Sequence, residues 1–377
     1  MRELLATLDD WARSDPEMAL ATVIRTSGST PRPAGARLLV SREGRMAGSV
    51  SGGCLESAVI LEGQATLRGA APPRVLHYGI SDELGWSVGL SCGGSCDIFI
   101  ETLRWDGSDE VLIAARQAID ADRGVALMTT VSGPHMGARA AAVEGGRWVG
   151  DLGQPGVEAA IRAGVEGRLG SGLAGIEEAE DTGVFVDPVV PAPHLVVVGA
   201  AHVAVPLTRM AKAAGYRVTV VDPRRAFLTE QRLPDADRLE AAWPDQVLAG
   251  IDLGPRDAAV CLAHDPKFED PALGILLRGR AGYVGAIGSR GTNAKRWARL
   301  REAGLDEAAL ARLHSPIGLD LGAVTPEEIA VAILAEVVAA RRGRRGGALS
   351  AKPVPEGLEA AVAGPAADPA GGSARIA

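Results

Sequence analysis

The chain has 377 residues, which is too long for one ordinary core and predicts two domains of roughly 100–200 residues each. Its formal net charge is -8 at pH 7, which disfavours nucleic acid or an anionic membrane as a partner. The N-terminus lacks the apolar segment of a signal peptide, and no window approaches the roughly 18 apolar residues that cross a bilayer, so we expect a cytoplasmic protein.

Glycine and cysteine content both bear on function. Glycine accounts for 48 residues, nearly twice the usual share of about 7%, and this excess indicates tight turns and loops that approach a ligand closely. The four cysteines are too few for a disulfide framework in a chain of this length. We therefore expect reduced thiols at Cys54, Cys92, Cys96 and Cys261.

The first half of the chain alternates short strands with helices. The hydrophobic spacing predicts an N-terminal helix, then strands over 18–30, 36–41, 74–80, 96–103, 124–131 and 184–189, a hairpin at Gly145-Gly146, and helices over 55–69, 110–122 and 157–167. This pattern predicts a separate α+β domain over residues 1–187. Three prolines in residues 188–193 then predict a stiff, extended linker.

After the linker, apolar strands alternate with helices. The strands are expected over 194–201, 216–222, 235–240, 257–263 and 282–288, and a last helix over 325–342, with Pro326 at its first position. Continuous apolar runs between helices are typical of a parallel sheet covered on both faces, so residues 194–345 are predicted to form a Rossmann-type doubly wound domain. Residues 346–377, rich in Gly, Pro and Ala, are predicted to be disordered.

A degenerate dinucleotide-binding pattern follows the first strand of this second domain. Gly199 and His202 open the expected helix, and Asp222 ends the next strand 23 residues after Gly199, where an acid would bond a ribose hydroxyl. Ala201 and Ala204 replace the second and third glycines, so NAD(P) is only an alternative ligand. The alternative is a Rossmann sheet with an empty or altered site.

Three more loops follow strands of the same sheet, at the edge where open α/β folds bind ligands. Gly288, Ser289 and Arg290 before a helix offer amides, a hydroxyl and a guanidinium, which together suit a phosphate. Arg290 as an ordinary surface charge is the simpler alternative. The other two loops contribute His264 with Asp265, and His314 with the residues that follow it.

Two thiol-bearing loops stand out in the first half. Ser51, Gly52, Gly53, Cys54 and Glu56 form a Gly/Ser loop that leads into a helix, whose N-terminus would favour a thiolate. A second loop, with Cys92, Gly93 and Gly94, runs into a strand and offers no helix dipole. Cys54 and Cys92 are candidate metal ligands, although a lone cysteine is more often a small apolar residue.

Several enzyme signatures are excluded. Residues 89–93 match the nucleophile-elbow string, but a strand follows them where that motif needs a helix. There is no Walker A sequence and no His-Glu-x-x-His. The chain offers a ligand crevice without an evident proton-transfer residue for hydride chemistry.

The order of the motifs resembles that of the XdhC/CoxI family, accessory factors that mature xanthine dehydrogenase and related molybdenum hydroxylases. The resemblance reaches to about Arg345. It is carried by Thr26–Pro31, Gly48–Glu56, Cys92–Gly94, Val198–Val203, Asp222–Arg224, His264-Asp265, Tyr283–Arg290, His314–Leu319 and Thr325–Ala330. The main departure from the family pattern is Ala201, where the family usually has glycine.

The resemblance implies a chaperone that binds the molybdenum cofactor, as molybdopterin or its dinucleotide form, while a cysteine desulfurase supplies sulfur, and inserts it into an apo-hydroxylase. It adds Arg224 to the expected cofactor-binding residues. We expect the cofactor between the two domains, touching loops of both, and a homodimer is possible. The alternatives are an NAD(P)-dependent oxidoreductase and a nucleotide-sensing regulatory module.

Overall fold

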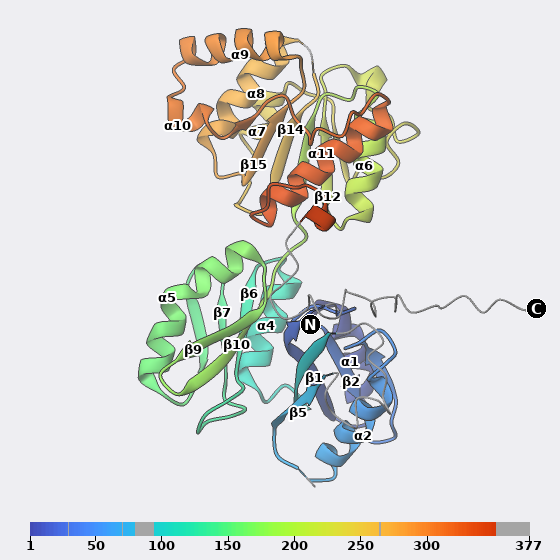
Figure 1. Ribbon diagram of the computed structural model, residues 1–377, viewed down its shortest axis with the longest axis vertical. Helices are drawn as coiled ribbons and strands as arrows, with labels where there is room; N and C mark the ends of the chain where they lie inside the picture. Colours follow the sequence, from blue (N-terminus) through green and yellow to red (C-terminus); the bar gives the residue numbers. More distant parts are fainter. Residues whose placement is uncertain (29, 70, 80–93, 264, 352–377) are drawn as a thin grey trace, which may run out of the picture.

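The structure is a computed structural model that describes residues 1–28, 30–69, 71–79, 94–263 and 265–351. The first half contains two sheets that lie side by side, and the second half is an α/β unit reached through a short connection after β10 (Figure 1). The predicted fold class, a Rossmann-type parallel sheet preceded by a separate α+β part, is confirmed.

The first sheet holds the N-terminal thiol loop. Its antiparallel order is β3-β2-β1-β5-β4, with β1 at Glu17–Ser27, β2 at Arg37–Val40, β3 at Met46–Gly48, β4 at Arg74–Tyr78 and β5 at Ser95–Arg104. Helix α1 spans Leu5–Ala12 after a 3₁₀ turn at Arg2–Leu4, and α2 spans Glu56–Leu67. Leu55 and Val59 pack α2 on this sheet with Ile98 and Ile100 of β5.

The second antiparallel sheet has the order β8-β7-β6-β10-β9. Its strands are β6 at Val125–Thr130, β7 at Arg139–Val143, β8 at Arg147–Asp151, β9 at Gly175–Ala179 and β10 at Thr182–Val189, with helices α4 at Glu110–Asp120 and α5 at Pro155–Ser171. One apolar cluster joins Leu20 and Leu103 of the first sheet to Leu127 and Ala141 of the second. The two sheets therefore share a core.

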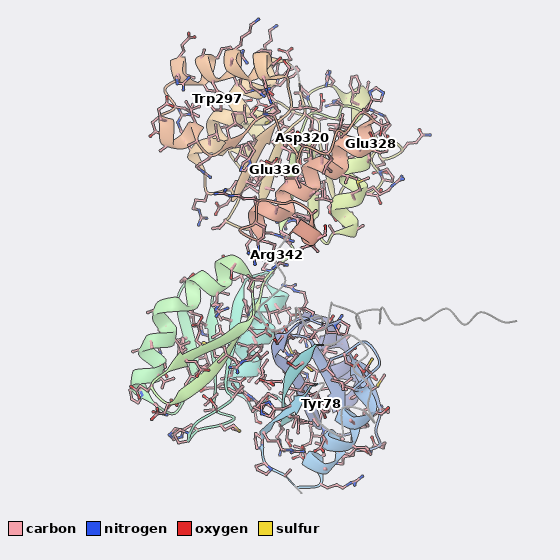
Figure 2. All side chains as sticks on the ribbon, viewed as in Figure 1. Tyr78, Trp297, Asp320, Glu328, Glu336 and Arg342 are labelled. Atoms are coloured by element: carbon pink, nitrogen blue, oxygen red, sulfur yellow. The ribbon has the colours of Figure 1, made fainter. Side chains whose placement is uncertain are left out.

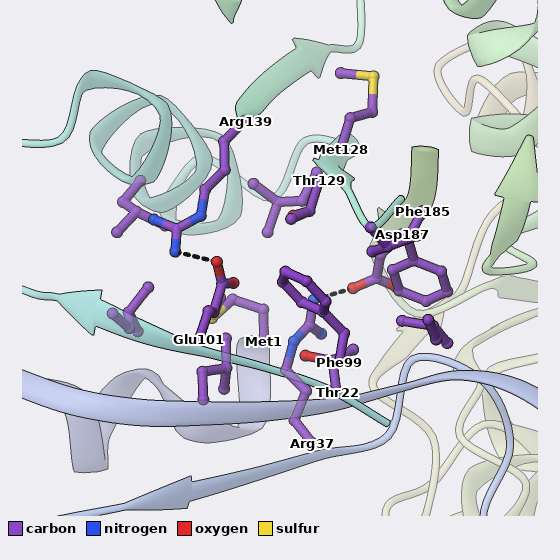
Figure 3. A pocket seen from close by; sticks show the side chains of 16 residues that line it. Met1, Thr22, Arg37, Phe99, Glu101, Met128, Thr129, Arg139, Phe185 and Asp187 are labelled. Carbon is purple, nitrogen blue, oxygen red and sulfur yellow. Dashed lines mark hydrogen bonds and ion pairs between the residues drawn. The ribbon is translucent and has the colours of Figure 1, made fainter. Parts of the chain in front are cut away.

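Charged side chains cross the seam between these two sheets (Figure 3). Arg139 donates to Glu101 at 2.6 Å, and Arg37 pairs with Asp187 nearby. The cavity between the pairs measures about 30 Å³, room for about two water molecules. This seam is therefore a packed joint and no place for a cofactor.

The connection to the second half is shorter than expected, because β10 continues through Pro188 and Val189. The parallel sheet has the order β13-β12-β11-β14-β15-β16, which is the 3-2-1-4-5-6 arrangement of a doubly wound fold. Its strands are β11 at His194–Val198, β12 at Arg217–Val221, β13 at Arg238–Glu240, β14 at Ala258–Cys261, β15 at Tyr283–Ala286 and β16 at Leu313–His314.

Helices cover both faces of the parallel sheet. They are α6 at Ala204–Ala213, α7 at Pro244–Leu248, α8 at Pro266–Arg278, α9 at Arg290–Glu302, α10 at Glu307–Leu310 and α11 at Pro326–Arg341, with 3₁₀ turns at Arg225–Phe227 and Leu349–Ala351. Thr325 and Glu328 form a capping box at the start of α11. Most of the predicted tail, 352–377, lies outside the described residues.

Among the described residues, no helix is both long and apolar enough to cross a membrane.

Candidate functional site

The strand order reverses between β11 and β14, and ligands of doubly wound folds bind beside this point at the carboxyl ends of the strands. Gly199 follows β11 with a φ of +101°, and a Cβ at this position would lie 2.7 Å from the backbone nitrogen of Ala263. Both observations require glycine here. They hold the loop after β11 close against the loop after β14.

The amides before α6 point to an anion. Helix α6 begins at Ala204, and within the described part of the chain the N–H groups of Ala201, His202 and Val203 have no hydrogen-bond partner. His202 is exposed. Unpaired amides at the N-terminus of a helix make a binding site for a negatively charged group. The degenerate glycine pattern thus still produces an amide cradle.

Asp222 is bonded to protein groups at both oxygens. Ala200 N–H donates to one oxygen at 2.8 Å, and the guanidinium of Arg224 donates to both, at 2.9 Å and 2.7 Å. Burial raises the pKa of the Asp222 carboxyl, but these hydrogen bonds outweigh it and the pKa is lowered overall. A ribose hydroxyl would have to compete with these partners, which weakens the case for NAD(P).

Asp265 caps the helix that follows the next strand end. Its carboxylate accepts from the amide of Lys267 at 3.0 Å. The hydrogen bond from Arg224 to Asp222 raises the pKa of Arg224, and the charge of Asp265 adds to this effect. Asp265 is exposed. His264, predicted beside it, lies outside the described residues.

Ser289 and Arg290 begin α9 as the sequence predicts. The Ser289 hydroxyl accepts from the amide of Thr292 at 3.2 Å, which caps the helix. Arg290 is exposed and has no ion-pair partner among the described residues. Its guanidinium is therefore free for an anion at the positive end of α9.

A buried polar network that sequence reasoning missed braces these loops. Arg296, 1% exposed, donates to Glu269 at 2.5 Å and to the carbonyl of Ile287 at 2.7 Å. It also bonds Ser315 at 2.9 Å and the side chain of Asn293. The network joins the first turn of α8, the loop before α9 and the loop after β16, so it fixes the strand-end loops relative to one another.

His314 belongs to a second internal cluster. Its Nδ1 lies 3.0 Å from Glu336 of α11, whose other oxygen accepts from the Tyr283 hydroxyl and the Gly318 amide, each at 2.6 Å. Figure 2 labels Glu336 within the second half. Burial and the bond to Glu336 both raise the pKa of Tyr283. These contacts hold the loop after β16 and involve only protein groups.

In the first half, the Gly/Ser loop folds around the carboxylate of Glu56. The amides of Ser51, Gly52 and Gly53 donate to this carboxylate at 3.0 Å, 3.1 Å and 2.8 Å, and the Ser49 hydroxyl donates at 2.6 Å. Burial raises the pKa of Glu56, but the hydrogen bonds dominate and lower it to about 2. The loop thus holds an anion of its own chain.

The folded loop displays Cys54 two residues before α2. Its side chain is half-buried and packs, as Tyr78 does, against the apolar cluster that contains Cys96. Burial raises the pKa of Cys96 to about 11 and that of Tyr78 to about 12. Cys96 and the fully buried Cys261 therefore have structural roles, and Cys54 is the accessible thiol among the described cysteines.

The second thiol loop is outside the description except at its end. Cys92 and Gly93 lie in residues 80–93, and Gly94 directly precedes β5. In the described ranges, no three His, Cys, Asp or Glu side chains gather in a group that could hold a metal ion. The proposed metal ligands, Cys54 and Cys92, remain a prediction.

The thiol loop and the strand ends do not meet as expected. The parallel strands start at the edge beside the connection, and β11 places its end five residues, roughly 16 Å, farther away. Helix α9 lies at the end of the molecule opposite the first half (Figure 1). In this arrangement, a cofactor would not reach both sets of loops within one chain, and its expected place between the halves stays a prediction.

The missed network left a signal in the sequence. Asn293, Arg296 and Leu300 are spaced by three and four residues and form the buried face of α9, so Arg296 occupies a core position. Glu269 likewise lies three residues before the buried Ala272 of α8. Opposite charges at the buried positions of two helices predict a buried ion pair.

Comparisons with known proteins match both halves. The profile of the XdhC Rossmann domain matches residues 195–337, and that of the XdhC and CoxI family matches residues 11–79. A protein of Bacillus subtilis, named as a probable subunit of xanthine dehydrogenase, is 28% identical over 89% of this chain and 96% of its own length. The molybdenum cofactor insertion chaperone PaoD of Escherichia coli is 25% identical over 85% of this chain and 83% of its own.

A solved structure agrees along nearly the whole chain. The crystal structure of a xanthine dehydrogenase from Bacillus halodurans superposes with a TM-score of 0.66 and is 26% identical, covering 92% of this chain and 97% of that one.

Proposed function

The chain belongs to the XdhC and CoxI family, and from this premise we propose that it binds the molybdenum cofactor and inserts it into a xanthine dehydrogenase-type apo-hydroxylase. The observation that carries the proposal is the strand-end edge of the parallel sheet. There the unpaired amides of Ala201 to Val203 and the free guanidinium of Arg290 present positive charge at two helix N-termini. Both are braced by buried contacts.

These residues fit the phosphate of a pterin cofactor. Amides at a helix N-terminus and a guanidinium are complementary to phosphate oxygens. When bound, the cofactor supplies the molybdenum and its terminal ligands, and the chain supplies the anion site. Both molybdopterin and its dinucleotide form carry the phosphate, so the cradle accommodates either form.

The thiol part of the proposal rests on Cys54. It is half-buried, and the Glu56-clamped loop fixes the backbone before it. We propose that Cys54, with Cys92, faces the molybdenum end of the cofactor while a cysteine desulfurase supplies sulfur. Within one chain, Cys54 lies far from the strand-end loops. Contact of both with one cofactor therefore requires rotation about residues 190–193 or a thiol loop from a second copy in a homodimer.

Replacing Arg290 tests the cofactor site. We expect Arg290→Gln to weaken binding of molybdenum cofactor about tenfold or more, because a charge-assisted hydrogen bond to phosphate is lost. Lys295→Gln is the matched control, since Lys295 is exposed on the same helix and farther from its N-terminus. Binding is measured by cofactor transfer to the purified full-length chain, followed by molybdenum analysis.

Equal binding by Arg290→Gln and Lys295→Gln would refute the assigned phosphate site.

In the same assay, Cys54→Ala is expected to retain the pterin phosphate contact and lower activation of the hydroxylase. Unchanged molybdenum retention and activation in a Cys54→Ala/Cys92→Ala chain would remove the thiol part of the proposal.

A further inference from the structure

A cluster of cations lies at the other edge of the parallel sheet, beside the connection between the halves. It consists of Arg256 before β14, Arg341 and Arg342 at the end of α11, and Tyr216 directly before β12. Figure 2 shows Arg342 at the end of the second half that faces the connection. We propose that this arginine cluster and the Tyr216 hydroxyl form a second anion site, selective for a phosphate group.

The Tyr216 hydroxyl is a buried donor without a partner. The residue is 2% exposed, and no described group bonds its hydroxyl oxygen. The guanidinium of Arg341 lies over the Tyr216 ring, 4.8 Å from its centroid. A buried hydroxyl without a hydrogen bond costs free energy, so native structures rarely leave one unless a ligand or water completes it.

The positive charge around this hydroxyl is not neutralised. Within the described part of the chain, none of the three arginines forms an ion pair with a carboxylate, whereas nearby Arg217 and Arg280 pair with Asp122 at 3.6 Å and Asp252 at 2.7 Å. Among the residues that the structure describes, the buried Nε atoms of Arg256 and Arg341 have no hydrogen-bond partner.

The acid closest in sequence to Arg256 already accepts hydrogen bonds from the backbone. The Asp257 carboxylate accepts from the amides of His194 and Gly254, each at 2.7 Å. Burial lowers the pKa of Arg256, and the like charges of Arg341 and Arg342 add to this effect. A bound dianion would relieve both the repulsion and the missing hydrogen bonds.

The helix dipole accounts for only part of this arrangement. The negative C-terminal end of α11 favours Arg341 and Arg342 there, as in many helices. It does not explain why Arg256 joins them or why a tyrosine hydroxyl is buried among them. Arg256 also donates to the Pro191 carbonyl at 2.9 Å, so the site borders the connecting segment.

Phosphate is the ligand class that these groups fit. Guanidinium groups bind phosphate with two parallel hydrogen bonds, and a hydroxyl donor adds a third. Of the four cluster residues, Arg256 lines a cleft of about 360 Å³ beside the connection, so the site is open to solvent on its Arg256 side. Inorganic phosphate and a phosphate monoester share this chemistry, and the experiment separates them.

The test is calorimetric titration of the full chain with inorganic phosphate and, separately, with AMP, at constant ionic strength. We expect Tyr216→Phe to bind about tenfold more weakly, because it loses one hydrogen bond to a charged ligand. Arg341→Gln should weaken binding similarly. Arg280→Gln is the control, since Arg280 lies on the same edge but is paired with Asp252.

Arg290→Gln separates this site from the strand-end site, because it should leave the Tyr216-dependent binding intact. Tighter binding of AMP than of phosphate would identify a phosphate ester as the ligand, and equal affinity would identify the free ion. Tyr216→Phe removes a hydroxyl without a partner, so the fold should persist. If Tyr216→Phe binds as tightly as the unchanged chain, or phosphate binds no better than chloride, the proposal is overturned.

Discussion

At the scale of single residues, Glu56 decides what the Gly/Ser loop can do. Its carboxylate accepts the amides that a ligand anion would otherwise use, and its pKa of about 2 keeps it ionised at neutral pH. The loop therefore acts as a rigid mount for Cys54. Gly52 and Gly53 adopt φ of +77° and +125°, which lets successive amides point at one carboxylate.

Replacing this carboxylate should loosen the loop. We expect Glu56→Gln to lower the free energy of local opening by about 1–3 kcal/mol, the usual cost of losing hydrogen bonds to a charged group. Hydrogen exchange of the peptide covering residues 49–55 measures it. Glu62→Gln is the control, because Glu62 is on the same helix but pairs with Arg74. Equal exchange in the two variants would contradict this role.

The same residue gives a pH dependence with a definite sign. The folded pKa of about 2 is below the ordinary value of 4.5, so the stabilisation is complete above pH 4.5 and declines as the pH falls towards 2. The melting temperatures of the unchanged chain and of Glu56→Gln should therefore converge in acid.

The sequence predicted a Gly/Ser loop before a helix, but residue spacing does not reveal that a glutamate side chain folds back onto the loop.

At the scale of elements, the ion pair of Arg296 and Glu269 ties together the loops that follow three strands. Both side chains are almost fully buried, at 1% and 2% exposure. A buried pair contributes little net stability compared with apolar residues, but it fixes geometry, and losing one partner is costly. We infer that the ion pair fixes the position of the loop before α9 relative to the loop after β16.

Replacing one partner of this ion pair should destabilise the fold much more than replacing both. We expect Arg296→Met to destabilise the second half by about 3–5 kcal/mol, because Glu269 is left buried and unpaired. The double variant Arg296→Met/Glu269→Met should recover much of that loss in thermal unfolding. Additive effects of the two substitutions would show that they do not form one unit.

Helices and strands with a strong hydrophobic pattern in their own sequence were predictable. Strands that form only because a neighbouring strand pairs with them were not. The apolar runs of β11, β12, β14 and β15 and the helical spacing of α11 predicted the Rossmann domain. Strand β9, with the sequence Gly-Ile-Glu-Glu-Ala, has no strand alternation and forms because β10 pairs with it. The three-residue β3 and the five-residue α7 are too short to show a period.

At the scale of the whole molecule, parallel topology separates the functions. All strands of the parallel sheet run away from the first half, so the strand-end loops and the arginine cluster occupy opposite edges. The sequence predicted the thiol loop and the strand-end loops but not their separation, because that separation depends on the direction in which the parallel strands leave the connection. A thiol and a phosphate site so far apart require domain movement or a second protein to act on one cofactor.

The most direct test of the central claim is the content of the protein purified from molybdenum-replete cells. We predict close to one molybdenum atom and one phosphorylated pterin per chain, with both reduced in Arg290→Gln and retained in Lys295→Gln. Finding neither metal nor pterin, while the hydroxylase matures normally in cells that lack this chain, would contradict the account.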